Sequence, residues 1–141
     1  NQVMQVIKEG ARCLLGGKIP DDNPGAFYPV TVLDKITEKM PMFDEEIFGP
    51  VLSIIPAISD EHALELANNT RFGLSAAVFT NDLQKAEKFA KQIETGTCYI
   101  NQLVASNKLL PIGGIKDSGF GRELSFLGIH EFVNAKVIVI K

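Results

Sequence analysis

The stretch from residue 51 to residue 101 alternates short apolar runs with helical patterns, and this alternation constrains the fold more than any other feature. Residues 60–69 and 82–94 carry apolar side chains at helical spacing, and an acidic residue opens each segment. Residues 51–58, 74–80 and 97–101 are apolar runs of strand length. Strands and helices that alternate through short connections are typical of a parallel sheet covered by helices. The sequence therefore predicts an α/β fold.

A shorter set of elements precedes this stretch. Residues 1–11 carry an apolar face typical of an amphipathic helix, and residues 11–15 and 27–33 are predicted strands. Residues 19–26, rich in Pro, Asp, Asn and Gly, are a predicted exposed loop. No Ser, Thr or Asp stands before the first helix to cap its amides. We therefore expect this helix to begin further upstream in a longer protein.

Composition excludes several classes of protein. At 141 residues and 45% hydrophobic content, the chain is long enough for one domain with a single packed core. The 14 basic and 17 acidic side chains give a net charge of −3 without any run of Lys or Arg, which argues against nucleic acid as a partner. No apolar stretch reaches the roughly 20 residues that cross a bilayer. We expect a soluble, cytoplasmic protein with no membrane partner.

The cysteines and histidines show no metal-binding pattern. Cys13 and Cys98 lie far apart without CxxC or Cys/His spacing, so we expect two buried, reduced thiols. His62 and His130 lie in predicted helices without a second ligand nearby. The sequence therefore predicts no metal site.

Three loops follow or precede predicted strands, where ligands of parallel sheets bind. The first, EEIFGPV at 45–51, has a carboxylate that could accept ribose hydroxyls and a turn fixed by Gly and Pro. The second, 102–110, contains Ser106 and Asn107, which could face a ligand. The third, 113–122, has four glycines, which suit a backbone that passes close to another segment or a ligand. It lacks the spacing of a phosphate-binding loop.

Six motifs occur in the order and approximate spacing of one enzyme family: GARCLLGG, FYPVTVLD, EEIFGPV, GLSAAVFT, TCYIN and GGIKDSGFGREL. On these motifs, nearly the whole chain resembles the C-terminal part of an NAD(P)-dependent aldehyde dehydrogenase. The segments NQLVASNKLLPIGG and GRELSFLGIHEFVNAK further resemble the succinate-semialdehyde dehydrogenase branch of that family.

The resemblance implies a fold and an assembly. Residues 1–134 would be part of the catalytic domain, a three-layer α/β/α structure with a mostly parallel sheet. Residues 135–141 (AKVIVIK) would be an oligomerisation strand that pairs with a neighbouring subunit in a homo-oligomer. The alternative is an ordinary edge strand in its own sheet.

The resemblance also assigns cofactor-binding residues, for NAD or NADP. Glu46 matches the carboxylate that binds the nicotinamide ribose hydroxyls, and Phe48 matches the ring beside the nicotinamide. Both would act by positioning the cofactor. The alternatives are a capping or surface acid for Glu46 and a core ring for Phe48. Leu74 matches a residue that lines the nicotinamide side of the cleft, although core packing explains a leucine there equally well.

Substrate-binding residues follow from the semialdehyde branch. Ser106 matches the serine that binds the remote carboxylate of the substrate, or else it bonds its own loop backbone. Ile112 stands where the family usually has an aromatic residue, which removes a flat wall and counts against aromatic aldehydes. Arg122 and Glu123 are expected to form an ion-paired loop anchor, with a role of Glu123 in proton or water transfer as the alternative.

The resemblance places the catalytic cysteine and the hydrolytic glutamate upstream of this chain. Neither Cys13 nor Cys98 has the surroundings of that nucleophile, so no catalytic residue is expected here and the chain alone should be inactive. The expected activity of the longer protein is oxidation of an aldehyde, succinate semialdehyde above others, through a cysteine thioester. The alternatives are another short aldehyde, or a non-catalytic binding or assembly module of the same fold.

Overall fold

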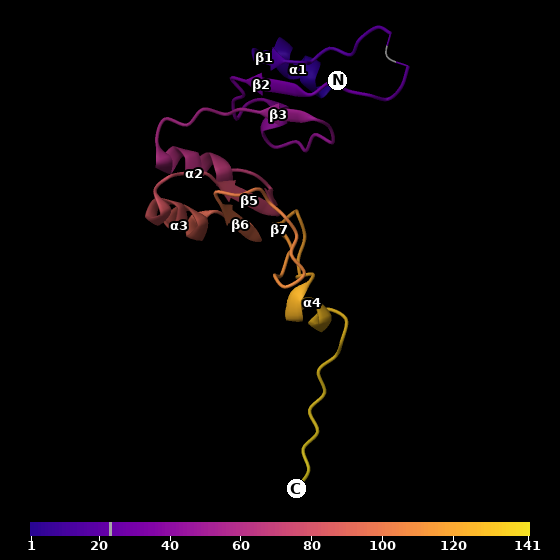
Figure 1. Ribbon diagram of the computed structural model, residues 1–141, viewed down its shortest axis with the longest axis vertical. Coiled ribbons are helices and arrows are strands. Elements are labelled where there is room, and N and C mark those ends of the chain that lie inside the picture. Colours follow the sequence, from indigo (N-terminus) through magenta and orange to yellow (C-terminus); the bar gives the residue numbers. More distant parts are fainter. Residues whose placement is uncertain (23) are drawn as a thin grey trace. The chain divides into compact units, whose positions relative to one another are not determined.

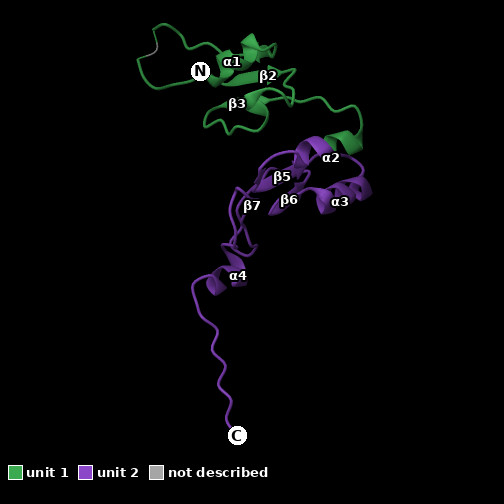
Figure 2. Cartoon of the chain, turned by 180° about the vertical axis from the view of Figure 1, so that it is seen from behind, with its two compact units in different colours: residues 1–63 green, residues 64–141 purple. Residues whose placement is uncertain are grey.

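The computed structural model describes residues 1–22 and 24–141, which divide into two compact units, 1–63 and 64–141 (Figure 2). This division differs from the single core expected from composition. The division after residue 63 also lies far from the domain boundary that the resemblance implied after residue 134. That boundary stays a prediction.

Unit 1 combines one helix with a small mixed sheet (Figure 1). Strand β2 lies in the middle, antiparallel to β1 and parallel to β3. The helix predicted over residues 1–11 is confirmed, whereas the strand predicted from residue 27 begins only at Thr31. The elements of unit 1 are α1 (Gln2–Lys8), β1 (Arg12–Leu15), β2 (Thr31–Asp34), the 3₁₀ turn η1 (Pro41–Phe43) and β3 (Val51–Ser53).

The core of unit 1 forms between α1 and the central strand. Leu33 of β2 is completely buried, and Val6 of α1 and Ile36 are nearly so. The apolar face predicted for α1 therefore packs on the sheet, as helix amphipathicity requires. Thr31 is the buried polar residue of this core, and its hydroxyl donates to the Pro29 carbonyl at 2.9 Å and accepts from the Gly17 amide at 2.8 Å. A satisfied hydroxyl can be buried at little cost.

Unit 2 is built around two parallel strands, β5 (Ser75–Val78) and β6 (Thr97–Ile100), with α3 (Leu83–Gln92) as the crossover that packs against them. Asp82 caps α3, since its carboxylate accepts from the Lys85 amide at 3.0 Å. The other elements are α2 (Asp60–Asn68), which runs across the boundary between the units, β4 (Phe72–Gly73), β7 (Ile115–Lys116) and α4 (Ser125–His130).

The prediction of one mostly parallel sheet is wrong for the described residues, which form three small sheets. The pair β5–β6 is parallel, β4–β7 is antiparallel, and the sheet of unit 1 is mixed. The strand predicted over 51–58 is also shorter: its pairing with β2 ends at Ser53, and the Ile54 amide makes one more bond, to the Leu33 carbonyl at 2.8 Å. The apolar run 51–58 predicts a buried strand, but its side chains are half-buried or exposed.

The glycine-rich segment passes close to other backbone, as its composition predicted. A Cβ on Gly96 would overlap the carbonyl oxygen of Gly113, and a Cβ on Gly113 would lie 2.5 Å from the carbonyl oxygen of Gly121. Beyond α4 the chain runs on in an extended path to its C-terminus (Figure 1). In the part of the chain that the structure describes, residues 135–141 are exposed and pair with no strand, so the oligomerisation strand stays a prediction.

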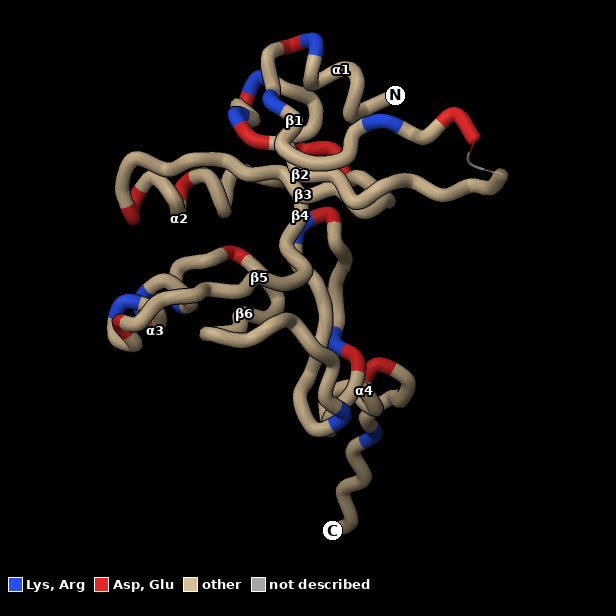
Figure 3. The backbone as a smooth tube through the Cα atoms, turned by 45° about the horizontal axis from the view of Figure 1, so that its top comes forward, with Lys and Arg blue, Asp and Glu red and all other residues tan. Residues whose placement is uncertain are grey.

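Charged residues of both signs are interspersed along the backbone (Figure 3). This distribution agrees with the net charge of −3 and the lack of a basic run in the sequence. Among the described residues, no helix combines the length and the apolar character needed to span a membrane.

Candidate functional site

The loop between η1 and β3 carries Glu46 and Phe48, and backbone hydrogen bonds hold it at both ends. The Glu45 amide donates to the Pro41 carbonyl at 2.9 Å, where the loop leaves η1. At the other end, the Gly49 amide donates to the Ile47 carbonyl at 2.9 Å and the Pro50 carbonyl accepts from the Thr31 amide at 2.9 Å. The turn that the sequence predicted at Gly49 and Pro50 is therefore also bonded to the central strand of unit 1, which the sequence did not predict.

Side chains of this loop alternate between the core and the solvent. Ile47 is half-buried and packs against the core of unit 1, whereas Glu46 is exposed and Phe48 is 94% exposed. An aromatic side chain so exposed does not belong to the core of unit 1, and the role of Phe48 stays a prediction. The inward Ile47 anchors the loop between the two outward residues.

The two carboxylates of the loop have different surroundings. The Gln2 side-chain amide donates to the Glu45 carboxylate at 3.3 Å. Within the described residues, no hydrogen bond or ion pair engages the Glu46 carboxylate, so its oxygens are available to hydroxyl donors of a ligand. The alternative of a plain surface acid is equally compatible with this exposure.

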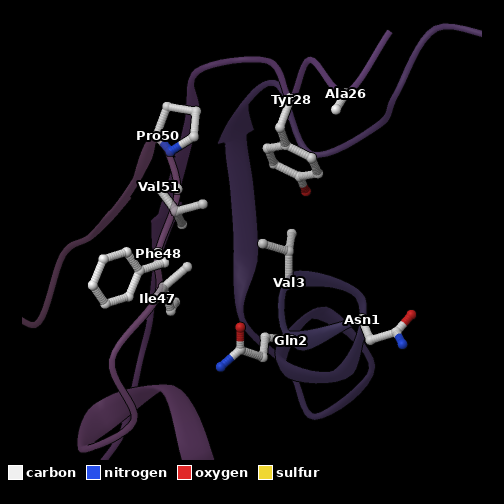
Figure 4. Close-up of a pocket in the computed structure, with 10 residues that line it drawn as sticks. Asn1, Gln2, Val3, Ala26, Tyr28, Ile47, Phe48, Pro50 and Val51 are labelled. Atoms are coloured by element: carbon white, nitrogen blue, oxygen red, sulfur yellow. The ribbon is translucent and has the colours of Figure 1, made fainter.

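A pocket of about 330 Å³ opens beside the loop in unit 1. Ile47, Phe48 and Val51 line one part of it, and Val3 and Tyr28 lie across from them (Figure 4). The Phe48 ring points away from Val3, which agrees with its exposure (Figure 4). The full lining is Asn1, Gln2, Val3, Ala26, Tyr28, Ile47, Phe48, Gly49, Pro50 and Val51. Sequence reasoning missed the contribution of Tyr28, because residues 26 and 28 join residue 48 only through the fold.

The other predicted site residues belong to unit 2. Leu74 connects β4 to β5 and is 51% exposed, so it is not a buried core residue. Ile112 is half-buried, and its backbone forms a bridge with Glu123 through hydrogen bonds of 3.0 and 2.7 Å. Glu46 and Phe48 thus come from one loop of unit 1, whereas Leu74, Ser106 and Ile112 come from three segments of unit 2.

Ser106 lies in an exposed loop that its neighbours hold in place. The Tyr99 hydroxyl donates to the Ala105 carbonyl at 2.7 Å, and the Asn107 side chain accepts from the Leu109 amide at 3.0 Å. The Ser106 hydroxyl makes no hydrogen bond within residues 1–22 and 24–141. The alternative that Ser106 bonds its own loop backbone is therefore not realised, and Asn107 has that role instead.

The loop anchor predicted at Arg122 and Glu123 exists with different partners. The Arg122 guanidinium donates to the carbonyls of Gly121 at 2.6 Å and Gly114 at 3.2 Å. The backbone amide of Arg122 donates to the Glu131 carboxylate at 3.2 Å. The anchor therefore uses backbone carbonyls rather than the expected pair with Glu123, whose side chain is exposed.

The thiols are free and half-buried, rather than fully buried as predicted. Burial raises the pKa of the Cys98 thiol, which disfavours the thiolate that a nucleophile needs. No group of three or more His, Cys, Asp or Glu residues is arranged to hold a metal ion in the described part of the chain.

Comparison with known proteins gives a consistent result. The model of the aldehyde dehydrogenase family matches residues 1–138. The chain is 48% identical over 138 residues to the succinate semialdehyde dehydrogenase [NAD(P)+] Sad of Escherichia coli K12, a match that covers 98% of this chain and 30% of that protein. The chain therefore spans about 30% of the length of this relative.

Two solved structures are similar in fold as well as in sequence. The structure of succinic semialdehyde dehydrogenase from Streptococcus pyogenes in complex with NADP+ matches with a TM-score of 0.93 at 41% identity, covering 99% of this chain and 30% of that one. An aldehyde dehydrogenase from Mycobacterium tuberculosis, complexed with NAD+, matches with a TM-score of 0.87 at 42% identity, covering 92% of this chain and 27% of that one.

Proposed function

The chain belongs to the aldehyde dehydrogenase family, and from this premise we propose that it is the C-terminal portion of a longer enzyme that oxidises succinate semialdehyde to succinate with NAD+ or NADP+. The observation that carries the proposal is the 48% identity to a succinate semialdehyde dehydrogenase across 98% of this chain. The order of the six motifs supports the C-terminal position. The cysteine that forms the thioester would then lie upstream.

Burial in unit 2 supports a larger protein around this chain. Among its described hydrophobic residues, only Ala86 is fully buried. Large apolar side chains such as Phe79, Leu103 and Phe126 are mostly exposed. Large apolar side chains exposed in this number are consistent with a surface that lies against other protein. The same reasoning supports a homo-oligomer that covers Val137, Ile138, Val139 and Ile140, which are all exposed.

The loop of unit 1 fits a dinucleotide by its geometry. Among the described residues, no hydrogen bond or ion pair engages the Glu46 carboxylate, which suits two ribose hydroxyls. Phe48 presents a flat, exposed ring that would limit the movement of a planar group beside it. The backbone bonds at Pro41, Gly49 and Pro50 fix the loop in advance, so little ordering is needed on binding. The loop would hold the nicotinamide ribose, and a bound NAD+ or NADP+ would supply the hydride acceptor for the oxidation.

The substrate side of the proposal depends on Ser106 and Ile112. Ser106 has an exposed hydroxyl with no partner in the described chain, and a hydroxyl can donate to a carboxylate. By the resemblance, Ile112 would supply an aliphatic wall where the family usually has an aromatic residue, which counts against aromatic aldehydes. Together they favour a short aldehyde that ends in a carboxylate.

Replacing Ser106 by alanine in the full-length enzyme tests this substrate. We expect KM for succinate semialdehyde to rise about tenfold, because a hydrogen bond to a charged group contributes about 1.5 kcal/mol or more. The KM for lactaldehyde, which has no carboxylate, should stay unchanged. Steady-state kinetics with both aldehydes gives the comparison.

The variant Ser106→Thr is the matched control, because it keeps the hydroxyl and should retain most of the affinity. An equal change for both aldehydes in Ser106→Ala, or no change for either, would remove Ser106 from the substrate site. Neither of these outcomes would change the assignment of the chain to the aldehyde dehydrogenase family.

A further inference from the structure

Tyr99 connects strand β6 to the loop that carries Ser106. It is the third residue of β6, half-buried, and paired in register with Ala77 of the parallel strand β5. Its hydroxyl reaches beyond the end of the strand and donates to the Ala105 carbonyl at 2.7 Å. Strand β6 thus holds the backbone of the exposed loop at Ala105.

The bonded carbonyl belongs to the peptide unit that leads into Ser106. A peptide unit is planar, so a hydrogen bond that fixes the Ala105 oxygen also fixes the Ser106 amide and restricts its Cα. On the other side of Ser106, Asn107 closes a turn with two hydrogen bonds. Its side-chain oxygen accepts from the Leu109 amide and its backbone carbonyl accepts from the Leu110 amide, both at 3.0 Å. Ser106 therefore sits between two held points, and its own hydroxyl stays without a partner in the described chain.

We infer that Tyr99 is a positioning residue that holds Ser106 for the carboxylate of the substrate through the Ala105 carbonyl. The inference rests on the proposed function of Ser106. It goes beyond that function, because Tyr99 would act through the Ala105 carbonyl and not by contact with the substrate. Nothing in the local sequence shows this role, since an aromatic residue in a strand is ordinarily a packing residue.

The minimal test is Tyr99→Phe in the full-length enzyme, which removes the hydroxyl and keeps the ring. We expect KM for succinate semialdehyde to rise about fivefold, the equivalent of one hydrogen bond of ordinary strength. The kcat for this substrate, and both constants for lactaldehyde, should stay at the wild-type values. A purely structural role for the bond would instead change the two aldehydes alike.

Thr95→Val is the matched control. Thr95 precedes the other end of β6, and its hydroxyl likewise donates to a backbone carbonyl, that of Thr97, at 2.9 Å. Its loss removes a similar bond without touching the loop of Ser106. We expect this variant to leave the kinetics of both aldehydes unchanged.

A double-mutant cycle separates the inference from the function on which it rests. If Tyr99 acts through Ser106, Tyr99→Phe should change KM for succinate semialdehyde by less than about twofold in a Ser106→Ala background. The positioning role is overturned, and the carboxylate role of Ser106 stands, if Tyr99→Phe has no effect alone or the same effect in both backgrounds. If Ser106→Ala itself leaves KM unchanged, both the function of Ser106 and the inference fail.

Discussion

Replacing Gly96 by alanine is expected to destabilise the protein by about 3 kcal/mol or more, the upper end of the range for overpacking. The new Cβ would overlap the Gly113 carbonyl oxygen and lie 2.8 Å from its carbon, and both atoms are backbone. Gly96 cannot move away easily, because its amide donates to the Gly73 carbonyl at 3.0 Å. Thermal unfolding followed by circular dichroism should show a midpoint several degrees lower.

Gly49→Ala is the control for this effect. A Cβ at Gly49 would meet nothing within 4 Å, and its backbone is outside the left-handed region. We expect a change in stability within about 0.5 kcal/mol, as for ordinary surface substitutions. A Gly96→Ala protein that unfolds at the wild-type temperature would show that the glycine-rich segment does not lie against Gly96.

Replacing Glu46 by glutamine is expected to have the largest effect on activity, lowering kcat about a hundredfold. The amide has the shape of the carboxylate, but only its oxygen can accept a hydroxyl, so one of two ribose contacts is lost. The nicotinamide would then sit less well for hydride transfer. Steady-state rates with aldehyde deuterated at the reacting carbon should show a larger isotope effect in the variant, because hydride transfer becomes rate-limiting.

Glu45→Gln is the matched control, since Glu45 precedes Glu46 directly and accepts from Gln2 instead. Its kcat should stay at the wild-type value. If both variants lose activity equally, the effect comes from the charge of the loop. If neither does, Glu46 is the surface acid that its exposure also allows.

The helices could be predicted from the sequence because their signals are local. Helix α3 has an apolar stripe and a capping Asp82, and both features lie within the segment itself. Which strands pair is not local information. The run after Pro50 has the pattern of a strand in any sheet, and only the structure shows that it pairs with β2 while β5 pairs with β6.

The candidate site shows the same limit. The resemblance to the family supplied Glu46, Phe48 and Ser106. The exposure of the Phe48 ring could not be predicted from the residue type, because phenylalanine is usually buried. The bond from Tyr99 to Ala105 joins residues six positions apart through a turn without a sequence signature. Likewise, the carbonyl partners of Arg122 depend on backbone direction, which no residue type encodes.

The most direct test of the account is the oxidation of a panel of aldehydes by the full-length protein with NAD+ and with NADP+, comparing succinate semialdehyde with lactaldehyde, glyceraldehyde and a long-chain aldehyde. The account predicts reduction of the nucleotide with the highest kcat/KM for succinate semialdehyde. A higher kcat/KM for an uncharged aldehyde would contradict the proposed substrate, and no reduction of either nucleotide with any aldehyde would contradict the proposed activity.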